Sequence, residues 1–174
     1  MYKRITESYV QSIDAETETV FSLLCPVREA EWLDGFNYEL IYSESGFAEE
    51  GCVFITKHDD SKKTLWIVTK RDSDKKEIEF VFFVFDSIVT KLNIKVNAKN
   101  ENTSNVYITY MHTALSEGGN RLLEGKTEEN FTKRMKFWEK SMNHYIKKGK
   151  KLKLDHLTIE HSWQNQLICI FVFY

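Results

Sequence analysis

His112 and Tyr110 are the residues of this sequence whose types and spacing best suit a reacting site. They lie two positions apart in the alternating run Val106 to Ala114, so as strand residues they share one face, which we expect to be the inward one. A histidine can give or take a proton near neutral pH, and a tyrosine hydroxyl can orient a carbonyl group. No motif places a serine or cysteine nucleophile beside them, and no acidic residue that would orient His112 is evident. A buried, hydrogen-bonded histidine is therefore the competing interpretation.

The other polar clusters give no pattern for a metal or a cofactor. Glu49 and Glu50 are adjacent, so on a strand they point to opposite faces and cannot converge as paired catalytic carboxylates must. The run His58-Asp59-Asp60 suits an exposed polar turn. The three cysteines are far apart and form no C-x-x-C, and neither G-x-G-x-x-G nor a phosphate loop occurs. We therefore expect no metal site and no cofactor.

Large aromatic side chains recur at alternating positions of the predicted strands, and others lie on the apolar stripe of a later helix. Such a face can fill a core, or it can line an apolar pocket that holds a few placed polar groups. The sequence leaves both interpretations open. For a pocket, the predicted ligand-binding residues are Trp32, Phe54, Trp66, Phe80, Phe82, Tyr110, His112, Trp138 and Met142.

The elements that must position these residues follow from changes of period along the chain. Residues 2–13 suit a strand, and Asp14 is a suitable N-cap for a short helix that ends at Pro26. A second short helix over residues 27–33 stops at Gly35. About six strands joined by short polar turns follow up to residue 114, which predicts an antiparallel meander. A spacing of three and four then predicts one long amphipathic helix carrying Phe131, Met135, Trp138, Met142 and Tyr145.

Composition and charge limit the class of protein. The 174 residues favour a single domain, and 42% hydrophobic residues with only one proline exclude a disordered or low-complexity chain. The net charge is −2, but nine basic residues lie between Lys133 and Lys153 against one acid, Glu139. We expect a solvated outer face of the long helix; an anionic lipid surface, nucleic acid or an acidic partner are the alternatives. Nucleic acid ranks low, because the aromatic residues of that helix follow its buried stripe.

Targeting signals and thiols indicate a cytoplasmic protein. The first residues contain no apolar run that would act as a secretory signal, and no stretch approaches the ~18 apolar residues of a transmembrane segment. Free cysteines suit a reducing compartment. The apolar, β-prone segment Leu167 to Tyr174 could add to a sheet edge, pack on a neighbouring chain or cover an apolar patch. A homodimer is accordingly left open.

One segment carries a resemblance to a known superfamily. It reads Cys25-Pro26-Val27-Arg28-Glu29-Ala30-Glu31-Trp32-Leu33-Asp34-Gly35-Phe36 and is similar to a segment of bacterial proteins of the START-like, or SRPBCC, superfamily. Residues 113–120, Thr113-Ala114-Leu115-Ser116-Glu117-Gly118-Gly119-Asn120, also resemble that group. The superfamily includes polyketide cyclases, lipid-transfer domains, pollen-allergen-like proteins and Hsp90-activator-like domains. The resemblance implies an α+β helix-grip fold: a curved seven-stranded antiparallel sheet wrapped around a long C-terminal helix, with two short helices after the first strand.

The predicted function is the binding of a small hydrophobic or amphipathic molecule between the sheet and the long helix. A helix-grip domain over residues 1–150 would hold that molecule, and residues 151–174 would be an extension of unknown role. Two alternatives belong to other classes, since one fold hosts many functions. One is a cyclase- or dehydratase-like enzyme using His112 and Tyr110 as acid and base. The other is a protein-interaction domain like the Hsp90-activator branch.

Overall fold

A computed structural model describes residues 1–58 and 62–153 of the chain. Two sequence predictions lie partly or wholly outside these residues: the turn containing Asp59 and Asp60, and the apolar C-terminal segment from Leu167. Among the described helices, none is both long and apolar enough to cross a membrane.

Seven antiparallel strands form one sheet in the order β1-β7-β6-β5-β4-β3-β2. β2 to β7 are consecutive neighbours, as expected for a meander whose strands are joined by short turns, and β1 closes against β7 at the far edge. The strands are β1 (Arg4–Ile13), β2 (Tyr38–Tyr42), β3 (Val53–His58), β4 (Lys62–Asp72), β5 (Glu77–Val84), β6 (Ile88–Asn100) and β7 (Thr103–Ala114). The predicted seven-stranded antiparallel sheet is therefore confirmed.

Two short helices separate β1 from β2. α1 (Thr17–Leu23) begins after Glu16, not after the predicted cap Asp14, whose backbone N–H instead donates to Asn143 Oδ1 at 2.8 Å. α2 (Pro26–Trp32) begins at Pro26, where the missing N–H of proline leaves no helical hydrogen bond unmade. Its buried face carries residues three positions apart, Pro26, Glu29 and Trp32.

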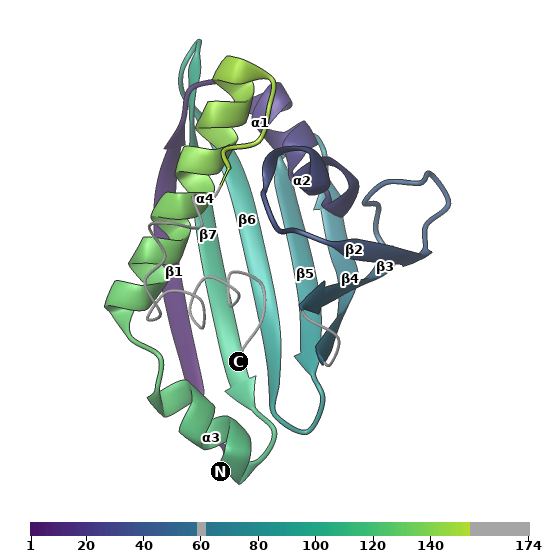
Figure 1. Ribbon diagram of the computed structural model, residues 1–174, viewed down its shortest axis with the longest axis vertical. Helices are drawn as coiled ribbons and strands as arrows, with labels where there is room; N and C mark the ends of the chain where they lie inside the picture. The colour runs from purple at the N-terminus through teal and green to yellow at the C-terminus, as the bar shows by residue number, and fades with distance from the viewer. Residues whose placement is uncertain (59–61, 154–174) are drawn as a thin grey trace.

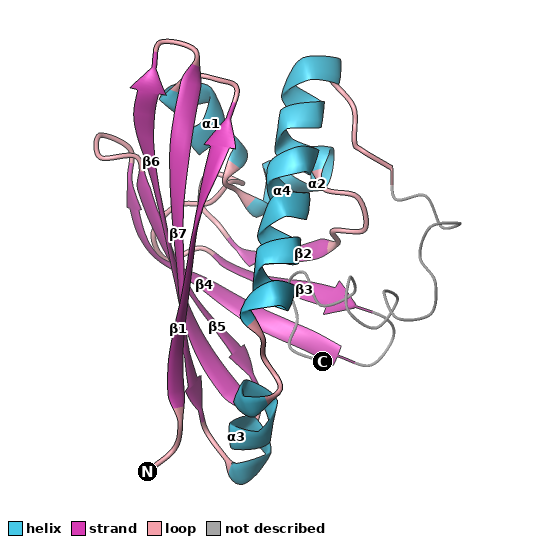
Figure 2. Ribbon diagram, turned by 90° about the vertical axis from the view of Figure 1, so that its left-hand side faces the viewer, coloured by secondary structure: helices cyan, strands magenta, loops and turns pink. Residues whose placement is uncertain are grey.

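The long helix is α4 (Glu128–Lys148), and its buried residues include Phe131, Met135, Trp138 and Met142, as the apolar stripe predicted. Gly149 ends it in the left-handed conformation at φ +65, a position that favours glycine. All the helices lie on one side of the sheet, and α4 runs along the sheet beside β1 with α2 facing it (Figures 1 and 2). The architecture is the predicted helix-grip arrangement.

A further helix, α3 (Glu117–Glu124), was not predicted. The side chain of Ser116 caps it by accepting a hydrogen bond from the Gly119 N–H at 3.1 Å. The two glycines of this segment are typical of a loop, which hid the helix in the sequence. Gly119 is instead required by packing, because a Cβ at this position would lie 2.0 Å from the backbone oxygen of Ser87.

Candidate functional site

Strand register places most of the predicted site residues in two adjacent rows across the helix-facing side of the sheet. The first row runs Phe54, Trp66, Phe82, Thr90, His112 and Ile5 from β3 to β1. The second runs Val68, Phe80, Leu92, Tyr110 and Glu7 from β4 to β1. Trp138 and Met142 of α4 and Trp32 of α2 complete the set from the helical layer. Except for the half-buried Tyr110, all nine predicted residues are at most 5% exposed.

The aromatic side chains form two groups. On the sheet, the Trp66 ring stacks on Phe82 and Phe54 at centroid distances of 3.9 and 5.5 Å, and Phe80 meets it edge-on at 6.1 Å. Between the helices, the rings of Trp32 and Trp138 lie 5.4 Å apart. Aromatic contacts of this kind stabilise a structure by about 0.5–1.5 kcal/mol beyond the area they bury. The aromatic face therefore contributes to the core, whatever else it binds.

Two of the three indole N–H groups in these clusters are hydrogen-bonded. Trp66 Nε1 donates to Thr56 Oγ1 at 2.9 Å, and Trp32 Nε1 donates to the backbone oxygen of Leu23 at 3.2 Å. The Nε1 of Trp138 is buried and has no hydrogen-bond partner. A buried donor without a partner costs about 1–3 kcal/mol, so this group is a candidate contact for a bound molecule.

His112 is held at both ring nitrogens. Its Nδ1 lies 2.8 Å from Thr90 Oγ1, and its Nε2 lies 3.1 Å from Glu7 Oε2. Burial lowers the pKa of His112 to about 4 despite the hydrogen bond with Glu7, so the ring is neutral at physiological pH. With Glu7 ionised, Nε2 carries the proton and Nδ1 accepts from the Thr90 hydroxyl. His112 is thus a buried, hydrogen-bonded histidine with neither nitrogen available to a substrate.

The interpretation that no acidic residue orients His112 was wrong, because Glu7 does so from β1. Burial alone would raise the pKa of Glu7, but the hydrogen bond with His112 and the charge of Lys126, whose Nζ lies 3.6 Å away, lower it. A signal was present in the sequence. The alternation of β1 puts Glu7 on the same face as Ile5, Gln11 and Ile13, which all face the helical layer.

Tyr110 sits beside this network. Its ring stacks on His112 at 5.6 Å and meets Phe131 of α4 edge-on at 5.8 Å. Burial, together with the carboxylates of Glu29 and Glu7, raises its pKa above the ordinary value of 10.0, although Arg134 opposes this shift. The hydroxyl therefore stays protonated and can serve as a hydrogen-bond donor, but not as a base, near neutral pH.

Glu29 is the functional candidate that sequence reasoning missed. It lies on the buried face of α2 and is 7% exposed. Within the described part of the chain, its carboxyl has no hydrogen-bond or ion-pair partner, and burial alone raises its pKa to about 8. The carboxyl is therefore mostly protonated at neutral pH and can both donate and accept a hydrogen bond. A titratable group perturbed in this way within an apolar surrounding is a typical feature of a functional site.

The acidic and thiol groups elsewhere have structural roles. Glu49 closes the loop before β3 by accepting hydrogen bonds from the hydroxyls of Ser43 and Ser45 and from the Glu44 N–H. Cys25 accepts from the Ala48 N–H at 3.3 Å, and burial raises the pKa of Cys52 to about 11. Among residues 1–58 and 62–153, no three histidine, cysteine or acidic side chains gather in a way that could hold a metal ion.

No protein-family model and no curated protein matches the sequence. Several solved structures match this chain, and they share its fold. Norcoclaurine synthase from Thalictrum flavum, solved in complex with dopamine and hydroxybenzaldehyde, has a TM-score of 0.65 at 8% identity over 86% of this chain and 90% of that one. Major latex-like protein 151 from Panax ginseng has a TM-score of 0.62 at 14% identity over 82% and 97% of the two chains. The Zhui aromatase/cyclase of a Streptomyces species has a TM-score of 0.64 at 8% identity over 86% and 100%.

Proposed function

From the helix-grip fold that this chain shares with those proteins, we propose that it binds a small apolar or amphipathic molecule between the sheet and α4. The observations that carry the proposal are the Glu29 carboxyl, which is 7% exposed and has no partner among the described residues, and the Trp138 N–H, one of several buried polar atoms there that make no hydrogen bond. Both belong to helices that face each other across the Trp32–Trp138 contact. In a core that was only structural, such groups would be a net loss of stability.

The polar groups define the kind of ligand. A protonated carboxyl, an indole N–H and the Tyr110 hydroxyl can all donate hydrogen bonds, so together they suit a neutral oxygen acceptor such as a carbonyl or phenol. The aromatic side chains would contact the apolar part of the same molecule. Aromatic aldehydes and phenols, which norcoclaurine synthase holds in its crystal structure, are therefore suitable first probes.

The same groups bear on the enzymatic alternative. A reaction that uses His112 as acid or base has no support, because Glu7 and Thr90 occupy its nitrogens and its pKa is about 4. If proton transfer occurs in this region, Glu29 is the better donor and acceptor, since a pKa of about 8 lies close to neutral pH. Binding is the common requirement of both functions and is what we propose here.

A titration followed by tryptophan fluorescence tests the proposal. Three of the four tryptophans of the chain, Trp32, Trp66 and Trp138, lie among the proposed ligand-binding residues. The probes are 4-hydroxybenzaldehyde, an aromatic polyketide and a medium-chain fatty acid. We expect at least one of them to give a saturable change in fluorescence and to raise the melting temperature.

Two substitutions locate the binding site. Glu29→Met removes the carboxyl at nearly constant volume, and Trp138→Phe removes the indole N–H together with part of the ring; each should weaken binding by about three- to tenfold. Glu50→Met, the same substitution at an exposed residue, is the matched control and should bind as the wild type does. Equal affinity in all four proteins, or no saturable response to any probe, would contradict the proposal.

A further inference from the structure

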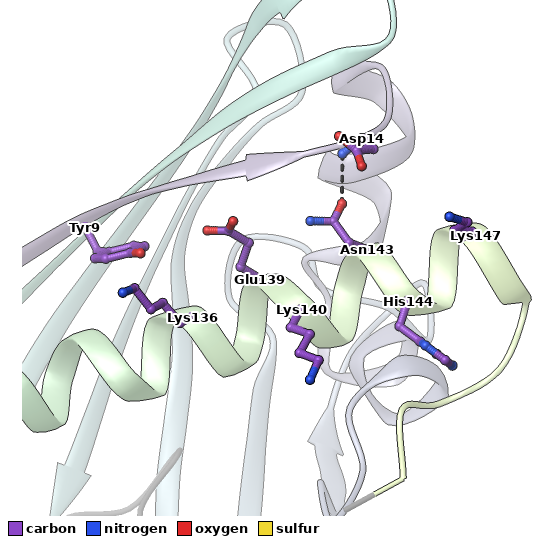
Figure 3. Close-up of a pocket in the computed structure, with 8 residues that line it drawn as sticks. All are labelled: Tyr9, Asp14, Lys136, Glu139, Lys140, Asn143, His144 and Lys147. Carbon is purple, nitrogen blue, oxygen red and sulfur yellow. Dashed lines mark hydrogen bonds between the residues drawn. The ribbon is translucent and has the colours of Figure 1, made fainter.

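A separate surface lies on the outer side of α4, where a shallow groove of about 530 Å³ runs between this helix and β1. Its lining includes Lys136, Lys140, His144 and Lys147 of α4 and Tyr9 of β1. Figure 3 shows these side chains together with Asp14, Glu139 and Asn143. The volume falls within the range of known ligand sites. The groove is distinct from the aromatic interior, since all of these α4 residues are off the buried stripe.

β1 is an edge strand, and its outer backbone groups belong to its even-numbered residues. The Ala114 N–H donates to the Lys3 oxygen at 2.9 Å, which fixes the odd-numbered residues as the ones whose backbone groups face β7. At the end of the strand, α4 satisfies the outer groups: Asn143 Nδ2 donates to the Ser12 oxygen at 3.0 Å, and the Glu139 carboxylate accepts from the Ser12 N–H.

The earlier part of the same edge is uncovered. The backbone groups of Thr6, Ser8 and Val10 point outward, and within the described chain none of them has a hydrogen-bond partner. Figure 2 looks onto this edge, and no described helix or strand lies over it. An uncovered edge of this kind presents alternating donors and acceptors that pair with another extended chain.

Positive charge lies beside the later part of this edge, where Lys136 is next to Tyr9 and the other lysines follow along α4 toward Asp14 (Figure 3). Lys136, Lys140 and Lys147 are exposed, and none forms an ion pair within the described residues. They span 11 helical positions, or about 16 Å, which equals about five residues of extended chain. The Glu139 carboxylate is turned onto β1, where it accepts from the Ser12 N–H, and of these lysines it interacts with Lys136.

From this juxtaposition we propose that the groove binds an acidic segment of a partner protein, which adds to the sheet as a strand beside β1. Alternate residues of that segment face α4, so acids at every second position would meet the lysines. The opposite face of the added strand would lie near Val10 and Tyr107, which are 50% and 42% exposed and pair across β1 and β7. The segment therefore alternates acidic with apolar or β-branched residues.

The charges also decide against other occupants. A second copy of the chain pairing through its own β1 would bring two lysine rows together, and this repulsion disfavours a homodimer at this edge. A phosphodiester backbone or a lipid headgroup offers acceptors but no regular donors, so it would leave the outward carbonyls of β1 unpaired. A peptide backbone supplies both donors and acceptors.

The probe is a fluorescein-labelled peptide, Glu-Thr-Glu-Val-Glu-Thr-Glu, measured by anisotropy and by hydrogen exchange. We expect saturable binding that weakens with salt, and a reduction of at least about tenfold in the exchange rates of the Ser8 and Val10 amides. A peptide with the same side chains but N-methylated at alternate amides keeps the charge and loses the donors. It should bind at least about tenfold more weakly.

Two variants test the two halves of the site. Lys136→Glu/Lys140→Glu should weaken binding by about tenfold or more, whereas Lys95→Glu/Lys99→Glu, at exposed positions of β6, should leave it unchanged. Ser8→Pro removes one outward N–H without removing a backbone bond to β7, although it also removes the hydrogen bond between Ser8 Oγ and Thr109 Oγ1, and a melting curve checks that this variant is folded.

Three outcomes would overturn the proposal. The first is equal binding of the methylated and unmethylated peptides. The second is unchanged binding by the Lys136→Glu/Lys140→Glu variant. The third is binding to phosphatidylserine vesicles without binding to the peptide, which would assign the groove to a membrane surface.

Discussion

Glu29 makes the stability of this protein depend on pH with a sign opposite to that of most carboxylates. Burial raises the pKa of its carboxyl from 4.5 to about 8. Between these values the folded protein holds a proton that the unfolded chain has released, so the free energy of unfolding falls as the pH rises. One such proton corresponds to about 1.4 kcal/mol for each pH unit.

His112 acts in the opposite direction over a different range. Burial lowers its pKa from 6.5 to about 4, so in that range the unfolded chain holds the additional proton and stability rises with pH. Between pH 4.5, the ordinary pKa of Glu29, and pH 6.5, the ordinary pKa of His112, the two effects on the free energy of unfolding cancel. Above pH 6.5 the histidine is neutral in both states and Glu29 acts alone. The remaining 1.5 units up to about pH 8 correspond to a fall of about 2 kcal/mol.

Urea unfolding, followed by tryptophan fluorescence at several pH values from 6.5 to about 8, measures this slope. The wild type should lose about 2 kcal/mol over this range, while Glu29→Gln should lose none from this source. Glu50→Gln, at an exposed carboxyl, should run parallel to the wild type. The reasoning is refuted if the Glu29→Gln and wild-type profiles are parallel, because the carboxyl would then have the same pKa in the folded and unfolded states.

Three further comparisons, involving five substitutions, have definite expected outcomes. Trp138→Phe and Trp32→Phe remove the same ring atoms from the core, but Trp32→Phe also unpairs the Leu23 carbonyl, whereas the Trp138 N–H has no partner. The Trp32 variant should therefore lose about 1–3 kcal/mol more of the free energy of unfolding. A reversed order in urea unfolding would contradict the assignment. His112→Gln removes the histidine's contribution to the pH dependence of stability and leaves that of Glu29. The free energy of unfolding of this variant should rise by about 3 kcal/mol as the pH falls from 6.5 to 4.5. A free energy of unfolding that does not change with pH, measured by urea unfolding, would count against this. A Cβ fits at Gly118, so Gly118→Ala should raise the melting temperature of the domain slightly. A Cβ at Gly119 would clash with the backbone of Ser87, so Gly119→Ala should lower the melting temperature by several degrees. Equal effects of the two substitutions in a thermal melt would contradict the close contact with Ser87.

The strands could be predicted because their signals are local. Alternation in β5 and β6 was continuous, and the turns between strands were short and polar, so the neighbours in the sheet followed directly. The stripe of α4 was equally regular. β1 gave a weaker pattern, since a charged residue, Glu7, and a polar one, Gln11, occupy its inward face, and their partners come from β7 and α4.

Helix α3 and the cap of α1 could not be predicted because tertiary contacts decide them. Local propensity alone favours a loop at Gly119. The close approach of α3 to the backbone of Ser87 requires glycine at this position, because no Cβ would fit there. Asp14 has the right side chain for a cap, but its backbone is bound by Asn143, which is 129 residues away in the sequence. In both cases the decisive partner lies on another element.

The roles of Glu29 and His112 show why the chemistry was harder to infer than the fold. Histidine is the residue that usually titrates near neutral pH, so the sequence pointed to His112. Burial reverses the order of the two pKa values, because the pKa of the histidine falls to about 4 and the pKa of the carboxyl rises to about 8. The spacing of Pro26, Glu29 and Trp32 did place the carboxyl on the buried face of α2, but the sequence did not reveal that no partner meets it there. A proton-exchanging group in this interior is therefore to be sought on the helix and not on the sheet.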